Sequence, residues 1–94
     1  MDDQQRHAEL VRRLNDAKEA HFQFQETELG GVYDQQWSDW YARFLLDQGW
    51  NRLFTREWNA EQLAEALRRA DIEQRANAPD AKWQEYYADY FLKM

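Results

Sequence analysis

The stretch DQQWSDWYARFLL, from Asp34 to Leu46, decides the fold of this 94-residue chain. Its apolar side chains recur at spacings of three and four residues, which places them on one face of a helix. They are Trp37, Trp40, Tyr41, Phe44 and Leu45. Asp34 is the expected N-cap, and Gly49 can adopt the left-handed conformation that ends a helix. The spacing therefore predicts a helix over residues 35–48 with an aromatic face.

The same pattern returns 46 residues later in the chain. Asp80 and Trp83 correspond to Asp34 and Trp37, and both blocks fit the pattern D-x-x-W-x-[DE]-[WY]-Y-A-x-[FY]-x-L. The second block continues with Tyr86, Tyr87, Ala88, Tyr90 and Leu92. We therefore predict a second aromatic-faced helix over residues 81–93 and an internal repeat.

Two further helices are expected to supply the surfaces on which these faces pack. Residues 3–29 contain no Gly or Pro, and their apolar positions follow a seam with spacings of three and four residues. Gly30 is expected to stop this helix. Asn59 and Gln62 form a capping-box pattern, which predicts the start of a helix over residues 60–76.

These four segments predict an all-α fold with a single domain over residues 1–94. Two consecutive αα hairpins would form a four-helix bundle with an approximate internal twofold repeat. Trp50, Leu53 and Phe54 form an apolar linker that is too short to be an independent element. Because Trp, Tyr and Phe contribute five residues each and the chain has only nine Leu, the core must be built largely from rings.

The first predicted helix is much longer than the second. Its 26 or so residues extend about 40 Å, against about 21 Å for the helix after Asp34. The end that carries Leu10, Val11 and Leu14 must therefore be covered by another segment. Either a later part of the same chain or the same helix of a second copy is expected to cover it.

Composition excludes several classes of function. A net charge of −6 and a pI near 4.8 oppose nucleic-acid binding, which depends on clustered Lys and Arg. The absence of cysteine excludes disulfides and thiolate metal sites. The acidic N-terminus differs from a signal peptide, and no apolar run approaches the roughly 20 residues that span a bilayer. We expect a soluble cytoplasmic protein that binds neither nucleic acid nor membrane.

The block from Ala20 to Leu45, A-H-x(n)-Y-D-x-x-W-x-D-W-Y-A-x-F-L, resembles a recurrent signature of short bacterial proteins of unknown function. In those proteins a Trp and then a Trp-Tyr-Ala follow a helix that bears Ala-His. The resemblance implies no activity. The second repeat departs from the signature, because Asp71 stands in place of His21 and Tyr86 in place of the second Trp.

His21 is the first candidate for a functional site. It lies on the apolar seam between Ala17 and Phe24, where a polar group must be hydrogen-bonded, ionised or bound to a ligand. One hypothesis has His21, Asp71 and a carboxylate such as Glu28 bind a metal ion. The other has a core histidine that is bonded to a Tyr hydroxyl or to Asp71.

The aromatic faces are the second candidate. They line a cleft between the hairpins that binds a planar or cationic ligand, or they stay partly exposed and bind a partner protein. The third alternative is that they form the core and have no further role. Together the candidate residues are His21, Trp37, Trp40, Tyr41, Asp71, Trp83, Tyr86 and Tyr87. Ser38 is the only serine and has no histidine close in sequence. The sequence therefore predicts no catalytic residue, no metal and no cofactor.

The sequence favours a non-enzymatic interaction module that self-associates or binds another protein. Self-association would produce a homodimer through the first helix and exposed aromatic residues. The alternative is a protein that binds a small ligand or a metal, or a minor enzyme, with its site between the hairpins. That site would use His21, Tyr41, Asp71 and Tyr87.

Overall fold

The computed structural model describes residues 2–94, and all of their regular structure is helical. The elements are α1 (Asp3–Glu28), α2 (Trp37–Asp47), the short 3₁₀ helix η1 (Trp50–Leu53), α3 (Ala60–Asn77) and α4 (Trp83–Leu92). Residues 2–94 contain no strand, so the all-α prediction with four α-helices is confirmed. Within residues 2–94, no helix is both long enough and apolar enough to cross a bilayer.

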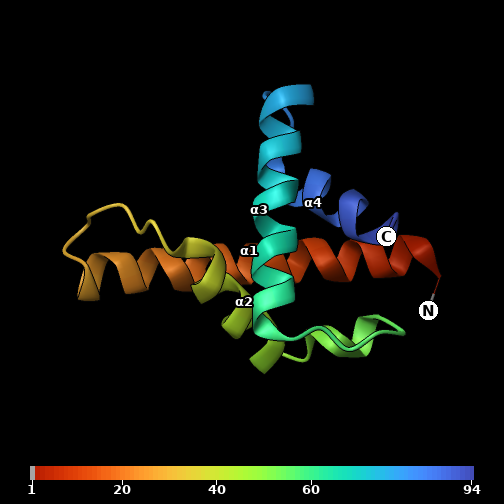
Figure 1. Ribbon diagram of the computed structural model, residues 1–94, viewed down its shortest axis with the longest axis horizontal. Coiled ribbons are helices and arrows are strands. Elements are labelled where there is room, and N and C mark those ends of the chain that lie inside the picture. The colour runs from red at the N-terminus through yellow and green to blue at the C-terminus, as the bar shows by residue number, and fades with distance from the viewer. Residues whose placement is uncertain (1) are drawn as a thin grey trace.

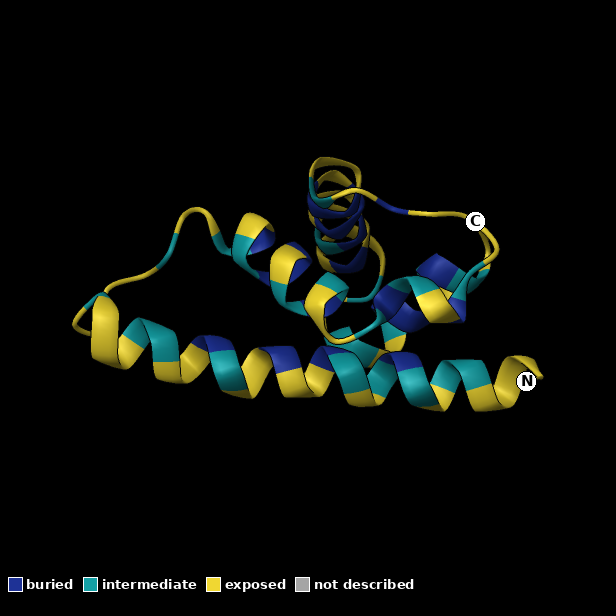
Figure 2. Ribbon diagram, turned by 90° about the horizontal axis from the view of Figure 1, so that it is seen from below, coloured by how far each residue is buried: buried dark blue, intermediate teal, exposed yellow. Residues whose placement is uncertain are grey.

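The four α-helices form a bundle in which the two halves of the chain share one core. α1 packs mainly against α4, and α2 packs mainly against α3, while α1 with α2 and α3 with α4 also touch. Figure 1 shows that α3 runs across α1 rather than along it. The buried residues of α1 lie on its side that faces the other helices (Figure 2).

Leu10 and Leu14 are covered within a single chain. Both side chains are 0% exposed, and the contacts of His7 with Asp89 and of Asn15 with Gln84 place α4 beside this part of α1. The sequence left two possibilities for what covers this end of α1. In the structure, a later segment of the same chain covers it. A second copy is not needed to bury this end of α1.

Aromatic rings cluster at both ends of the core. Around Phe91 on α4, the ring centroids of Trp50 and Trp58 lie 5.0 and 5.5 Å away. Trp50 is the largest fully buried side chain and begins η1. We expected the segment around Trp50 to form no helix or strand of its own, and this was wrong. Gly49, whose φ is +88°, turns the chain, and the 3₁₀ helix that follows begins with the buried indole of Trp50. At the other end the rings gather around Tyr41.

The predicted starts of the two aromatic helices were wrong. α2 begins at Trp37 after Gln36, and α4 begins at Trp83 after Lys82, in both cases without a side-chain cap. Asp34 instead bonds the imidazole of His21, as described below. The Asn59 capping box is confirmed, because Asn59 Oδ1 accepts from Gln62 N at 2.8 Å and Gln62 Oε1 accepts from Asn59 N at 3.2 Å.

Replacing Asn59 by alanine is expected to destabilise the fold by about 1 kcal/mol, because the amides of the first turn of α3 lose their acceptor. In a domain of this size that lowers the melting temperature by about 4–8 °C, measurable by circular dichroism. Asn77→Ala at the exposed end of the same helix is the matched control. Equal melting temperatures for the two variants would show that the cap contributes nothing.

Candidate functional site

Six of the eight candidate residues line one open cleft with a volume of about 370 Å³. These six are His21, Trp37, Tyr41, Asp71, Trp83 and Tyr87. They come from all four α-helices. We call this hollow the Asp71 cleft. The remaining candidates, Trp40 and Tyr86, lie outside it and border other hollows of the surface.

In the alignment of the predicted repeat, the six residues form three pairs of corresponding positions. Trp37 and Tyr41 on α2 correspond to Trp83 and Tyr87 on α4, because the two blocks are offset by 46 residues. Aligning Ala20 with Ala70 pairs His21 with Asp71 in the same way. The two candidates outside the cleft, Trp40 and Tyr86, are also equivalent to one another. In this sequence alignment, both members of a pair therefore either line the cleft or lie outside it.

His21 is buried and bonded to a carboxylate from the loop between α1 and α2. Its Nε2 lies 2.9 Å from Asp34 Oδ2, and because a carboxylate only accepts, the imidazole N–H donates. The ring centroids of Trp40 and Tyr41 each lie 5.1 Å from that of His21. The expectation of Asp71 or a Tyr hydroxyl as its partner was wrong. The bond to Asp34 ties this loop to α1, with Gln36 N donating to the other carboxylate oxygen at 2.9 Å.

The metal hypothesis needed His21, Asp71 and Glu28 around one ion. Asp34 is instead the carboxylate that meets His21, and Glu28 lies exposed at the end of α1. Over residues 2–94, no group of three or more His, Asp or Glu side chains is placed to hold a metal ion.

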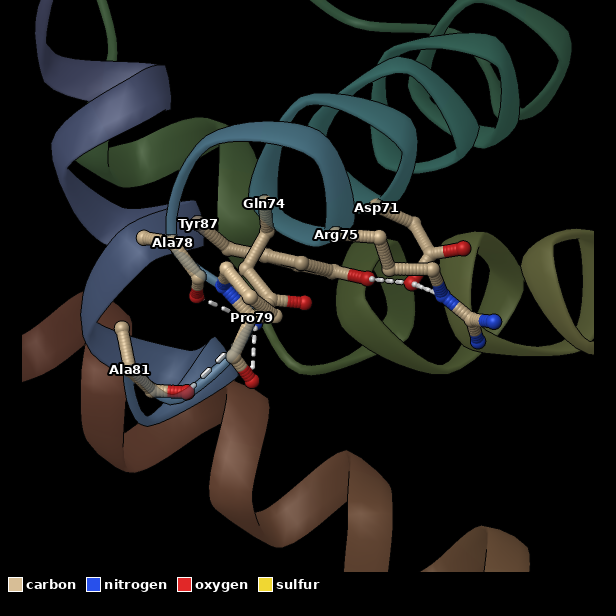
Figure 3. A network of polar contacts seen from close by, with 7 residues as sticks. All are labelled: Asp71, Gln74, Arg75, Ala78, Pro79, Ala81 and Tyr87. Carbon is tan, nitrogen blue, oxygen red and sulfur yellow. Dashed lines mark hydrogen bonds and ion pairs between the residues drawn. The ribbon is translucent and has the colours of Figure 1, made fainter.

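Asp71 is the polar centre of the cleft. Its Oδ1 accepts from the hydroxyl of Tyr87 at 3.0 Å and from Arg75 Nε at 3.1 Å, as Figure 3 shows. Asp71 and Arg75 thus form an ion pair between positions four residues apart on α3. Burial, reinforced by the Asp71 carboxylate, raises the pKa of Tyr87. Tyr87 therefore remains a hydrogen-bond donor across the physiological range.

The walls of the cleft are aromatic. Tyr41 sits between the two indoles, with its ring centroid 5.6 Å from that of Trp37 and 6.1 Å from that of Trp83. Burial raises the pKa of Tyr41 to about 12. Trp37 and Trp83 are half-buried, whereas Tyr33 at the rim is 65% exposed. The cleft thus offers accessible ring surface next to a carboxylate.

Gln74 is a buried residue of the cleft that sequence reasoning missed. Its Nε2 donates to the backbone oxygen of Ala78 at 2.9 Å, and the oxygens of Pro79 and Ala81 lie 3.5 Å away (Figure 3). These contacts close the turn between α3 and α4. The available signal was its position on the apolar seam of α3, four residues after Ala70.

Ser38 does not combine with a histidine. Its side chain is buried in the first turn of α2, and its hydroxyl accepts from Arg68 Nη1 on α3 at 2.8 Å. The hydroxyl thus joins two helices, whereas the buried histidine is paired with Asp34. This arrangement differs from a nucleophile held by a general base.

A comparison with protein-family models found no match, and comparisons with curated proteins and with solved structures found none either. The resemblance of residues 20–45 to the bacterial signature stays a prediction.

Proposed function

We propose that the protein is a non-enzymatic interaction module that recognises a cationic side chain of a partner protein in the Asp71 cleft. One observation carries this proposal. Indoles from α2 and α4 and a carboxylate from α3 meet in a single open cleft.

Aromatic faces attract cations. The face of an indole or phenol ring carries partial negative charge, and Trp is the strongest partner for an ammonium or guanidinium group. Trp37 and Trp83 are only half-buried, so part of each ring is accessible from the cleft. A volume of about 370 Å³ suits one side chain better than a large cofactor.

Asp71 supplies the matching negative charge. Among residues 2–94, the one cation paired with this carboxylate is Arg75, whose side chain is 73% exposed. Because the Arg75 side chain is largely exposed, its ion pair contributes little to stability, and a guanidinium from a partner can displace it. A net charge of −6 also favours encounter with a basic partner.

The partner is either another protein or a second copy of this chain. Val32 and Tyr33, in the loop beside the cleft, are among the most exposed large apolar residues. Exposed apolar side chains next to a cleft are typical of a protein-binding surface. A homodimer would therefore form through this loop and the cleft rather than through Leu14. Sedimentation of the purified protein separates a dimer from a monomer that binds another protein.

The internal repeat, with its two hairpins, is part of the proposal. A pseudo-twofold relation would exchange α1 with α3 and α2 with α4. The two main helix contacts fit this exchange, because it converts the contact between α1 and α4 into the contact between α3 and α2. An axis through the Asp71 cleft would also account for its three equivalent pairs of residues. The cleft would then be the place where the two halves of the chain meet.

Binding is tested with N-acetyl-arginine methylamide as the probe and the neutral, nearly isosteric N-acetyl-citrulline methylamide as its control. The indole N–H signals of Trp37 and Trp83 in ¹H–¹⁵N spectra are expected to shift with the arginine compound only. Asp71→Asn should weaken binding at least about tenfold, because a charge-assisted hydrogen bond is lost. Arg75→Ala should strengthen it, because the competing guanidinium is removed.

Glu73→Gln is the matched control, since this exposed residue lies on the same helix outside the cleft. Equal shifts with the citrulline compound, or unchanged binding by Asp71→Asn, would contradict the proposal.

A further inference from the structure

Three arginines of this acidic chain meet in one place. A second cleft, of about 420 Å³, is lined by Arg6 of α1, Arg52 of η1 and Arg56 of the segment that follows η1. No acidic side chain lines it among residues 2–94. We call it the arginine cleft. Arg6 precedes His21 by 15 residues on α1, which is about 22 Å along the helix, so this cleft is separate from the Asp71 cleft.

The charges of the arginine cleft are not neutralised inside the protein. Within residues 2–94, neither Arg52 nor Arg56 forms an ion pair, although the chain carries 18 Asp and Glu against 12 Lys and Arg. Arg6 has one partner, Asp3, at 3.7 Å, and the side chain of Asp3 is 89% exposed. Solvent screens a pair of this kind strongly. The cleft therefore keeps a positive potential.

Aromatic rings hold two of the guanidinium groups in place. The Arg56 Cζ lies 3.8 Å from the centroid of the Trp58 ring, and the Arg6 Cζ lies 5.5 Å from that of Phe54. A guanidinium stacked on a ring keeps its edge N–H groups available for a planar acceptor. The ring of Phe91 packs against that of Trp58, with 5.5 Å between the two ring centroids. Cations and apolar surface are thus combined in one cleft.

Two N–H groups of residues in this wall have no hydrogen-bond partner among residues 2–94. Trp58 is 4% exposed, and its indole N–H has no hydrogen-bond partner among residues 2–94. The buried Nε of Arg6 also lacks a partner within that part of the chain. Buried donors are normally paired, but Trp50 Nε1 and Arg13 Nε, outside this cleft, also lack a partner within residues 2–94, so the case for a ligand depends on the guanidinium groups.

We infer that the arginine cleft binds an organic oxyanion, a carboxylate or phosphate attached to an apolar or aromatic group. Carboxylate and phosphate oxygens match the paired N–H groups of a guanidinium and accept charge-assisted hydrogen bonds from them. Phe54 and Leu92, partly exposed apolar residues of its wall, provide the surface for the apolar part of the ligand. The two clefts would then have opposite charge preferences, with cations at Asp71 and anions at the arginines.

Calorimetric titration with phenyl phosphate and with benzoate tests the inference. We expect saturable binding of at least one of them, weaker at higher salt, with a shift of the Trp58 indole N–H signal. Inorganic phosphate should bind more weakly than phenyl phosphate because it lacks the apolar group. Benzyl alcohol should not bind because it lacks the charge. Comparison of phenyl phosphate with benzoate identifies the preferred oxyanion.

Arg52→Gln and Arg56→Gln should each weaken binding at least about tenfold, because each removes a charge-assisted donor. Both residues are exposed, so the fold is expected to remain, which circular dichroism checks. Arg69→Gln on α3, an exposed arginine paired with Glu65, is the matched control. The inference is overturned if the wild-type protein shows no saturable binding, if inorganic phosphate binds as well as phenyl phosphate, or if the two arginine variants bind like the control.

Discussion

Replacing Leu14 by glutamate is expected to unfold the protein rather than to dissociate a dimer. Leu14 is 0% exposed, so the variant loses the packing of a buried leucine, which is typically worth about 2–5 kcal/mol. It also places a carboxylate without a partner in the core, at a cost of several kcal/mol more. Since small domains are stable by only about 5–15 kcal/mol, we expect little native protein at 25 °C. Far-ultraviolet circular dichroism will show the loss of helix.

Ala8→Glu is the control for this experiment, because it adds the same charge at an exposed position of α1. It should leave the circular dichroism spectrum unchanged. If Leu14→Glu instead keeps the native spectrum and halves the mass measured by sedimentation, Leu14 lies in a dimer interface and its burial within one chain is wrong.

Raising the pH above 10 is expected to destabilise the fold steeply. The pKa of Tyr41 is raised to about 12 by burial, and that of Tyr87 is raised by burial and by the Asp71 carboxylate. In the unfolded chain both phenols ionise near pH 10. Above that pH the folded state therefore binds more protons than the unfolded state, and the free energy of unfolding falls as pH rises. Below pH 10 the two phenols are protonated in both states and cause no such slope.

The shift of Tyr41 alone is expected to cost about 2–3 kcal/mol by pH 12, and Tyr87 adds to that loss. Circular dichroism should show an unfolding transition in this window, together with a cooperative rise of tyrosinate absorbance. Tyr41→Phe should move the midpoint to higher pH, because one of the two linked ionisations is removed. Tyr33→Phe, at an exposed tyrosine, should not move it. Independent titration of all five tyrosines near pH 10 in a protein that stays folded would show that these two phenols are not buried.

The helices and several of their ends, though not the starts of α2 and α4, were predictable from local sequence. Gly30, Gly49 and the Asn59 capping box end or start helices through backbone conformations and hydrogen bonds that involve only neighbouring residues. Spacing along a helix also placed the aromatic side chains on one face of α2 and of α4. These are properties of a helix by itself, so they do not depend on how the helices pack.

The partners of polar groups were not predictable in the same way. Asp34 has the sequence signature of an N-cap, yet it bonds His21, because the loop folds back and brings a buried imidazole within 2.9 Å of its carboxylate. Leaving a buried donor without a hydrogen bond costs more free energy than leaving an exposed helix end without a cap. Leu14 could equally have met a second copy, and only the packing of the later helices decided that it is buried within one chain.

By itself, the sequence determined an all-helical chain with a ring-built core and the residues most suited to a site, since helical periodicity and side-chain chemistry are local. Tertiary structure alone decided which of those residues share a cleft and which carboxylate meets His21. It also brought Arg6 next to Arg52 and Arg56, although 46 residues separate the first two along the chain. Contacts of this kind depend on how the helices cross, and the crossing follows from the packing of all the rings together rather than from any one segment.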